Sequence, residues 1–502
     1  MSAVTDLLAG FGVALSGQNL LYCFVGSVLG TLVGVLPGIG PTSAIAILLP
    51  ITSSLSPMPA IIMLAGIYYG AMYGGSTTSI LLNMPGEVAS VPTCLDGYEM
   101  ARQGRAGPAL AIAAISSFFA GTVSLLGLTF FAPTLADAAL VFGPPEYFAL
   151  MLFALTMVIN LSGKDIVKGF ISALFGFLVS AIGLDAVSGS ARFTFGSIEL
   201  MGGINFISVI IGLFAVAEIL SSLEESITAV FPGKIKGLLP TLQDLKTSLG
   251  PMIRSTFIGF FLGLLPGLST GITAFMAYDV EKRISKHPER FGKGAIEGVA
   301  APEGANNSAT SGAFIPLLSL GIPPGPALAV LLGAFMIYGL QPGPLLFEHH
   351  SGFAWGLIAS MYIGNLMLLV LNLPLVGIWV KVCKIPYAIL SPLVLIFSFI
   401  GAFSVRDSMF DVWMAVLFGG IGYLMKKMNY PSAPMVLAIV LASRLEGSLR
   451  ESLNMSMGNP AILFNRLISL GLIMLALLFT VLSFWARKKH VRIMEEAVED
   501  RQ

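Results

Sequence analysis

Long apolar runs separated by short polar or Gly- and Pro-rich intervals extend along almost the whole chain. A helix needs about 20 apolar residues to cross the hydrocarbon core of a bilayer. The runs lie at 18–36, 42–55, 59–83, 107–133, 145–161, 166–185, 203–222, 251–265, 268–280, 294–322, 324–346, 353–380, 387–404, 409–425, 432–443 and 461–486. Because some runs are too short to span alone, the pattern predicts an all-α polytopic membrane protein with about 10–14 membrane segments.

The longest polar interval, 223–250, divides these runs into two halves. We therefore expect a first membrane repeat over 1–222, an amphipathic cytoplasmic connector over 223–250, a second membrane repeat over 251–486 and a cytoplasmic tail over 487–502. The mixed composition of the connector is typical of a short helix that lies along the membrane interface.

The two halves resemble each other in sequence. GTLVGVLPGIGPTSAI begins at Gly30 and GFFLGLLPGLSTGITA begins at Gly259, so their Gly and Pro residues coincide at an offset of 229 positions. The stretch from Gly70 and the stretch from Gly304 form a second pair, and GPALA at 107–111 and 325–329 forms a weaker third. Three pairs in the same order indicate an internal repeat.

Charge placement predicts that the halves have opposite orientations. Residues 1–17 and 51–60, which flank the first Leu-Pro-Gly segment, contain no Lys or Arg, whereas 234–254 and 282–293 around the second are rich in both. Basic residues in short loops mark the cytoplasmic side, so the first hairpin is expected outside and the second inside. Two inverted-topology repeats with re-entrant, broken-helix hairpins are typical of secondary transporters. The basic tail RKKHVR at 487–492 then predicts a cytoplasmic C-terminus.

The Leu-Pro-Gly segments predict helix breaks that open helix N-termini within the membrane. Proline removes a backbone hydrogen bond and glycine permits the turn, and a free helix N-terminus attracts an anion. The candidate substrate-binding residues are the Gly, hydroxyl and amide residues in and opposite these breaks: Gly38, Gly40, Thr42, Ser43, Ser76, Thr77, Thr78, Gly267, Ser269, Thr270, Asn306, Asn307, Ser308 and Thr310. The alternative is that such small residues only allow close helix packing.

An ionisable group within a membrane segment is a functional candidate in its own right. Glu303 precedes Asn306 and Asn307 by about one helical turn, and amide and carboxylate oxygens suit a hard cation. We therefore assign Glu303, Asn306 and Asn307 to the coupling ion, Na⁺ or H⁺. Glu218 is a second candidate, whose alternative role is that of a buried structural acid paired with an arginine.

Composition excludes several classes of protein. Of the 502 residues, 56% are hydrophobic and 11% charged, and Lys plus Arg equals Asp plus Glu at 27 each, so a nucleic-acid partner is not expected. Three scattered cysteines and four histidines form no metal-ligand spacing, and H-E-x-x-H does not occur. We expect no enzyme activity, no cofactor and no metal centre. A channel would need a pore lined by like subunits or charges, which inverted broken-helix repeats do not favour.

The chain resembles the large membrane subunit of the bacterial tripartite tricarboxylate transporters, the TctA family. The resemblance rests on GTLVGVLPGIGPTSAIAILLP (30–50), MPGEVASVPTCLDGYEMARQGRAG (84–107), GLFAVAEIL (212–220), LGPMIRSTFIGFFLGLLPGLSTG (249–271) and EGVAAPEGANNSATSGAFIPLLSLGIPPGPALAVLLGAF (297–335). Pro92, Cys94 and Ser269-Thr270 depart from the residues more usual in that family, which bears on the substrate taken.

This resemblance implies a multi-pass protein of the bacterial inner membrane that imports citrate or other carboxylates, driven by an ion gradient. It also implies two partners, a small four-helix membrane subunit and a periplasmic solute-binding protein that delivers the carboxylate. Within transporters, the alternative is a one-component Na⁺ or H⁺ symporter for a carboxylate or an amino acid.

Overall fold

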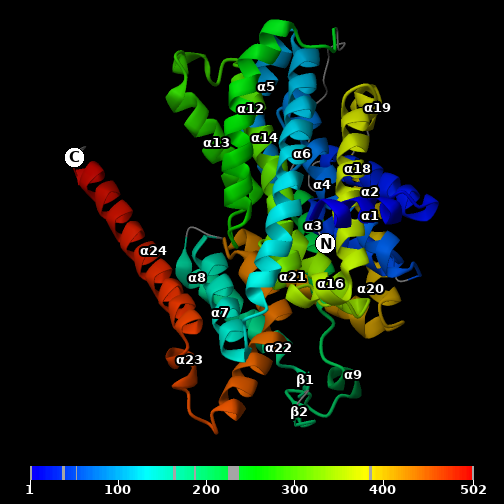
Figure 1. Cartoon of the computed structure of the whole chain (residues 1–502). Coiled ribbons are helices and arrows are strands. Elements are labelled where there is room, and N and C mark those ends of the chain that lie inside the picture. Colours follow the sequence, from blue (N-terminus) through cyan, green and yellow to red (C-terminus); the bar gives the residue numbers. More distant parts are fainter. Residues whose placement is uncertain are drawn as a thin grey trace. The chain divides into compact units, whose positions relative to one another are not determined.

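The computed structural model describes residues 3–36, 40–52, 54–161, 165–185, 188–223, 237–383 and 387–499, and these are almost entirely helical (Figure 1). The chain forms two compact units: Met1–Leu140 with Asn205–Leu424, and Val141–Ile204 with Met425–Gln502. Most of the predicted connector, 224–236, lies outside the described residues, as does the tip of the first Leu-Pro-Gly hairpin at 37–39.

The first unit contains the helices that carry the sequence motifs. They are α1 (Ala3–Ala14), α2 (Gly17–Val35), α3 (Pro41–Thr52), α4 (Pro57–Leu82), the 3₁₀ turn η1 (Val88–Ser90), α5 (Val91–Arg102), α6 (Ala106–Ala139), α10 (Phe206–Ile210), the π-helical η2 (Ile211–Val216), α11 (Ala217–Ser222), α12 (Leu242–Gly263), α13 (Thr270–Ile284), η3 (Pro288–Arg290), α14 (Glu297–Gly312), α15 (Phe314–Leu320), α16 (Pro326–Ile337), α17 (Pro344–His349), α18 (Ser351–Asn372), α19 (Val376–Val382), α20 (Tyr387–Ser404) and α21 (Met409–Lys427), whose end passes into the second unit.

The second unit contains α7 (Pro144–Leu161), α8 (Ile166–Ser180), β1 (Gly183–Leu184), β2 (Ala191–Arg192), α9 (Ile198–Met201), α22 (Ser432–Met455), α23 (Ile462–Asn465) and α24 (Leu467–Glu499). The two strands pair antiparallel, with Gly183 opposite Arg192. Arg450 of α22 holds this ribbon through Asp185, with nitrogen–oxygen distances of 2.9 and 3.2 Å. Salt bridges therefore fix the ribbon to the helical part of the unit.

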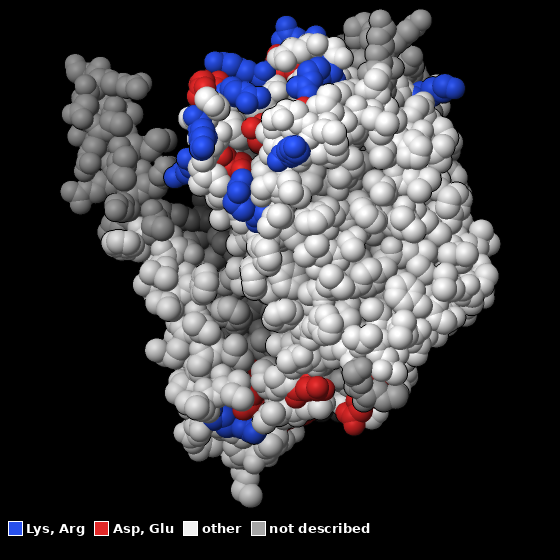
Figure 2. Space-filling model, turned by 45° about the horizontal axis from the view of Figure 1, so that its top comes forward, with Lys and Arg blue, Asp and Glu red and all other residues white. Residues whose placement is uncertain are grey.

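The apolar surface confirms that the chain is an all-α membrane protein apart from this ribbon. Among the described helices, α2, α6, α18, α21 and α22 are long and apolar enough to cross a bilayer, and several others are apolar but shorter. Lys and Arg side chains gather at the end of the molecule that comes forward in Figure 2, above a broad uncharged surface. A wide uncharged surface is what contact with the hydrocarbon core of a bilayer requires.

Glycines allow α2 and α4 to pack backbone against backbone. A Cβ at Gly30 would lie 2.7 Å from the carbonyl oxygen of Ile67, and a Cβ at Gly34 would collide with the carbonyl of Ala71. Only glycine fits at such crossings, as in other close helix pairs within membranes.

The same packing recurs between α12 and α14. A Cβ at Gly259 would collide with the carbonyl of Ala305, and one at Gly263 with that of Ala309. These partners lie 238 positions after Ile67 and Ala71, whereas the sequence comparison paired Gly70 with Gly304 at an offset of 234. Residues that make equivalent glycine contacts in the two halves are therefore 238 positions apart. This offset exceeds that of the motif comparison by four residues, or about one helical turn.

Asp96 of α5 anchors the segment that leads into α14. Its Oδ1 accepts hydrogen bonds from the backbone N–H groups of Gly292, Gly294 and Ala295 at 2.9, 2.8 and 2.7 Å. The hydroxyl of Tyr278 in α13 donates to Oδ2 at 2.9 Å. This fully buried carboxylate thus joins α5, α13 and the start of α14.

Candidate functional site

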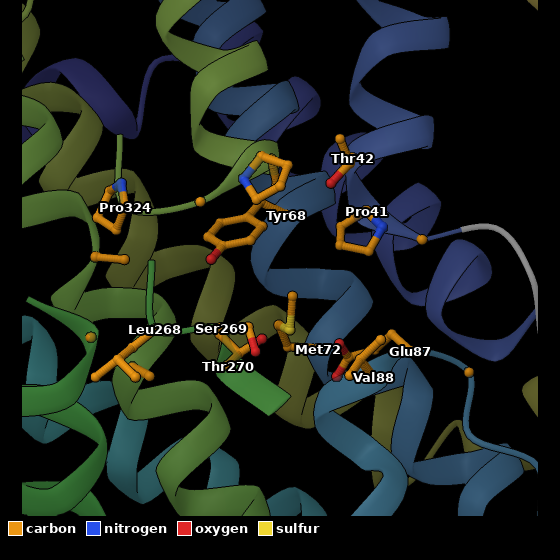
Figure 3. Close-up of a pocket in the computed structure, with 18 of the residues that line it drawn as sticks. Pro41, Thr42, Tyr68, Met72, Glu87, Val88, Leu268, Ser269, Thr270 and Pro324 are labelled. Atoms are coloured by element: carbon orange, nitrogen blue, oxygen red, sulfur yellow. The ribbon is translucent and has the colours of Figure 1, made fainter. Parts of the chain in front are cut away.

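A pocket of about 410 Å³ lies in the first unit, where both predicted hairpins end (Figure 3). It is lined by Gly40, Pro41, Thr42, Tyr68, Met72, Pro85, Gly86, Glu87, Val88, Val91, Glu218, Gly263, Leu268, Ser269, Thr270, Ala309, Ala313, Pro324, Gly325, Pro326 and Ala327. The lining is a mixture of apolar side chains, hydroxyls and carboxylates.

The first hairpin contributes the residues that begin α3. Gly40 precedes the helix, and Pro41 and Thr42 form its first turn on the pocket wall. Proline suits this position because its missing N–H would have no intrahelical partner there. The break predicted after Leu-Pro-Gly is therefore a helix N-terminus at the pocket, while Gly38 lies outside the described residues.

The second hairpin contributes the residues that begin α13. Ser269 is its N-cap, with Oγ accepting the N–H of Ile272 at 3.3 Å, and Thr270 follows as the first helical residue. Gly267 has a φ of +86°, a left-handed conformation that favours glycine. Its N–H donates to the carbonyl of Pro324 at 2.9 Å, which ties this tip to the next wall of the pocket.

A third helix N-terminus reaches the pocket at the start of α16. Gly325 precedes the helix without a side-chain cap, and Pro326 and Ala327 line the pocket. This is the second copy of the GPALA segment, which the sequence comparison ranked as its weakest pair. Three helices of twelve or more residues thus direct their N-terminal ends at one cavity, and each such end carries a partial positive charge.

Carboxylates supply the formal charge on the pocket wall, and no Lys or Arg is among the described residues that line it. Glu218, a sequence candidate, is one of them. Glu87 is the other, and the sequence analysis did not single it out: its Oε2 accepts the N–H of Ala89 at 3.0 Å as the N-cap of η1. The sequence feature that could have indicated its position is Ser90, three residues later, because Glu87 and Ser90 together form a capping box at the start of η1.

Asn306 lies directly behind Glu87. Its Nδ2 donates to Glu87 Oε1 at 3.3 Å and to the carbonyl of Met72 at 3.5 Å. The hydroxyl of Thr310 donates to the backbone carbonyl of Asn306 at 2.8 Å, within α14. Asn306 is fully buried, and its Oδ1 has no hydrogen-bond partner in the part of the chain that the structure describes.

Glu303 is buried one turn earlier on α14, away from the pocket wall. The hydroxyl of Ser76 donates to Oε2 at 2.6 Å and that of Thr93 to Oε1 at 2.5 Å. Ser76 was a sequence candidate and Thr93 was not. Each oxygen therefore has a neutral donor, and no salt bridge to this carboxylate occurs within the described ranges.

The remaining sequence candidates lie within helix interfaces rather than on the pocket wall. Ser308 donates to the carbonyl of Thr256 at 2.5 Å and contacts the hydroxyl of Ser124, joining α14 to α12 and α6. Ser43 of α3, together with Thr77 and Thr78 of α4, is buried and does not line the pocket. Asn307 faces a separate small cavity.

Comparison with known proteins gives the same family as the sequence motifs. Residues 20–437 match the family described as "Tripartite tricarboxylate transporter TctA family". A protein of Agrobacterium vitis, described as an uncharacterized 52.8 kDa protein in the TAR-I ttuC′ 3′ region, is 48% identical over 484 residues, which is 96% of each chain.

A second Agrobacterium vitis protein, described as an uncharacterized protein in the TAR-II ttuC′ 3′ region, is 44% identical over 225 residues. That alignment covers 45% of this chain and 93% of the relative. No solved structure matches the chain.

Proposed function

The chain belongs to the TctA family of the tripartite tricarboxylate transporters, and we propose that it is the subunit that moves a carboxylate across the bacterial inner membrane, driven by an ion gradient. The family is a transporter component rather than an enzyme family, and it works together with other subunits of a tripartite system. The choice of substrate and coupling ion is our proposal.

The observation that carries the proposal is the meeting of three helix N-termini in one pocket. Thr42 at the start of α3 and Ser269 and Thr270 at the start of α13 add hydroxyl donors to these positive ends. A carboxylate removed from water needs such donors because burying an uncompensated charge costs many kcal/mol. The pocket therefore supports an anionic substrate held by backbone and hydroxyl groups.

A coupling cation is needed because the wall already carries negative groups. Glu87 and Glu218 line the pocket and Glu303 lies behind it. A carboxylate substrate would be repelled by ionised neighbours in this low-dielectric setting. Binding of Na⁺ or H⁺ close to these residues would remove the repulsion and couple substrate entry to the ion gradient.

We propose that alternating access uses the two halves as inverted-topology repeats. Support comes from the opposite charge asymmetry of the two Leu-Pro-Gly hairpins and from the matching glycine contacts of α2 with α4 and of α12 with α14. The two hairpin tips would open the pocket to opposite sides of the membrane in turn, as in other repeat transporters. The C-terminus would then be cytoplasmic.

The test is uptake by proteoliposomes containing this subunit and a small four-helix membrane subunit, with a periplasmic solute-binding protein added outside. A panel of radiolabelled mono-, di- and tricarboxylates is offered under separate Na⁺ and H⁺ gradients. We expect accumulation of one carboxylate that requires both a gradient and the binding protein. Accumulation without the binding protein would establish the one-component alternative, and no carboxylate uptake under any gradient would refute the proposal.

A cross-link tests the role of the tips. Thr42→Cys with Ser269→Cys, in a background without the native cysteines, should lose transport when a bifunctional thiol reagent joins the two. Each single variant treated in the same way is the control. Full transport with the tips joined would contradict the proposed movement.

A further inference from the structure

A second, much smaller cavity lies on the other side of α14. It measures about 10 Å³, which is about the space that one water-sized sphere occupies. It is lined by Tyr69 and Tyr73 of α4, Gly121 and Leu125 of α6, Asn307 and Ser311 of α14, and Met361 and Asn365 of α18. Four helices thus enclose a space that fits a single small ion or molecule.

The hydrogen bonds around the cavity fix which atoms of Asn307 face it. Nδ2 of Asn307 donates to the backbone carbonyl of Glu303 at 3.1 Å and to Ser117 Oγ at 2.7 Å. Because a backbone carbonyl can only accept, the amide nitrogen must face Glu303, and Oδ1 must point away from it. No described residue donates to Oδ1, and Asn307 lines the cavity, so we take Oδ1 as the atom available to an occupant.

The same argument orients two hydroxyls. Asn365 Nδ2 donates to the carbonyl of Phe118 at 3.1 Å, so its Oδ1 is the atom that receives the Tyr73 hydroxyl proton at 2.5 Å. Ser311 donates to the backbone carbonyl of Asn307 at 3.3 Å. Both protons are thus directed at obligate acceptors, and the oxygens of Tyr73 and Ser311 offer only lone pairs to any occupant.

The charge that such an occupant would balance lies one helical turn away. Glu303 is fully buried, its carboxylate oxygens accept from the neutral hydroxyls of Ser76 and Thr93, and it has no basic partner in the part of the chain described. An ionised carboxylate in this position needs a nearby cation because neutral hydrogen bonds alone do not offset its desolvation.

From these two observations we propose that the cavity beside Asn307 is a site for one dehydrated Na⁺, coordinated by Asn307 Oδ1, Tyr73 Oη and Ser311 Oγ and balanced by Glu303. A hard monovalent cation prefers neutral and anionic oxygen ligands. A proton would be held by Glu303 itself and would leave the cavity empty, because the lining offers only amide and hydroxyl oxygens, which do not accept a proton near neutral pH.

The site's role in coupling rests on the proposed transport function. Asn306 contacts the pocket residue Glu87, and the next residue, Asn307, faces the ion cavity. Neighbouring residues on a helix point about 100° apart, so one turn of α14 forms part of both walls. An ion seated beside Asn307 therefore fixes the helix segment that supports the substrate pocket.

Ion binding can be measured without any substrate. The full chain, purified in detergent, is melted over a series of NaCl concentrations, with choline chloride or KCl keeping the ionic strength constant. We expect a Na⁺-specific rise in melting temperature. Ser311→Ala and Tyr73→Phe should each raise the Na⁺ concentration for half-maximal stabilisation by about fivefold or more, the effect of losing roughly 1 kcal/mol of ligand interaction.

The matched control is Ser360→Ala. Ser360 is equally buried on α18, next to Met361 of the lining, but its hydroxyl donates to the carbonyl of Leu357 at 2.7 Å and it does not line the cavity. Its Na⁺ dependence should match that of the wild type.

No Na⁺-specific stabilisation of the wild type, or the same Na⁺ dependence in Ser311→Ala and Tyr73→Phe as in the control, would overturn the site. If either variant fails to fold, the other and the comparison of Na⁺ with K⁺ in the wild type still decide the question. Na⁺-specific stabilisation with the expected variant shifts but no carboxylate uptake would uphold the ion site and count only against the proposed function.

Discussion

Ser76 Oγ donates a 2.6 Å hydrogen bond to Glu303 Oε2, although the two residues are 227 positions apart in the chain. Ser76 lies on α4, in the first half of the sequence, and Glu303 on α14, in the second. Both residues are buried. The polar segments that the sequence identified within two apolar runs are therefore in direct contact.

Replacing Ser76 by Ala should weaken ion-dependent transport. The change leaves Glu303 Oε2 without the hydroxyl that donates to it, and a buried charged acceptor that loses its partner costs roughly 1–3 kcal/mol. Uptake as a function of Na⁺ concentration and the melting temperature are the measurements. The control is Ser79→Ala on the same helix, because Ser79 is also buried but its hydroxyl does not donate to Glu303. Equal effects of the two variants would show that the hydrogen bond from Ser76 to Glu303 has no particular role in ion-dependent transport.

Glu303→Gln should change the ion dependence of transport more than the affinity for the carboxylate. The amide keeps the size of the side chain but removes the charge that we assign to balancing the cation. We expect a higher half-saturating Na⁺ concentration and a weaker response to a Na⁺ gradient in reconstituted uptake. Wild-type ion dependence in this variant would remove Glu303 from the coupling mechanism.

Asn306→Ala should lower the affinity for the carboxylate. The substitution removes the amide that donates to Glu87 Oε1 at the pocket wall and, more weakly, to the Met72 carbonyl. The expected penalty is roughly 1–3 kcal/mol, or about 5- to 150-fold in the half-saturating substrate concentration. Asn372→Ala, which removes a buried amide that instead contacts α2 through Thr31, is the control. An unchanged half-saturating concentration would assign Asn306 to packing alone.

Gly34→Ala and Gly263→Ala should each destabilise the protein. An added methyl group would meet the backbone carbonyl of Ala71 or of Ala309, which cannot move aside without separating the helices. Overpacking of this kind costs roughly 1–3 kcal/mol. Gly420→Ala is the opposite case, because nothing lies within 4 Å of its new Cβ, and it should leave stability unchanged or raise it slightly. Thermal melting in detergent gives the order of the three variants.

Inverted topology predicts that Leu55→Cys and His287→Cys react from opposite sides of the membrane. The native cysteines are removed first, and an impermeant thiol reagent is applied to intact cells and to inverted vesicles. The His287→Cys variant should react only in inverted vesicles and the Leu55→Cys variant only in intact cells. Labelling of both variants in intact cells would be incompatible with inverted repeats.

The helix breaks could be predicted from the sequence because their cause is local. Proline and glycine at 37–41 and 266–271 restrict or free the backbone wherever they stand, and α3 and α13 do begin at Pro41 and Thr270. The apolar runs predicted the membrane class for the same reason, since length and hydropathy act within one segment.

Contacts between distant segments were beyond such an argument. Glu87 stands in a polar turn, and only the fold brings it to Asn306, 219 positions away. Tyr73 and Asn365 lie on different helices, and their pairing across 292 positions has no sequence signature. Which residues of α12 and α14 contact each other likewise depends on three-dimensional packing. The motif comparison therefore gave an alignment of α14 with α4 that differs by one helical turn from the contacts in the structure.

The hydrogen bonds of Asp96 connect α5 to the backbone of the loop before α14. The pocket residues Glu87 and Val88 lie at the start of the turn η1, which leads into this helix. Asp96, in the middle of the helix, accepts three hydrogen bonds from the backbone of 292–295 on one oxygen. If Glu87 and Val88 move together with α5, the basic loop at 285–295 must move with them, or the buried Asp96 carboxylate must lose its hydrogen bonds to that loop. A reporter group on that loop would therefore sense events inside the membrane from the aqueous side.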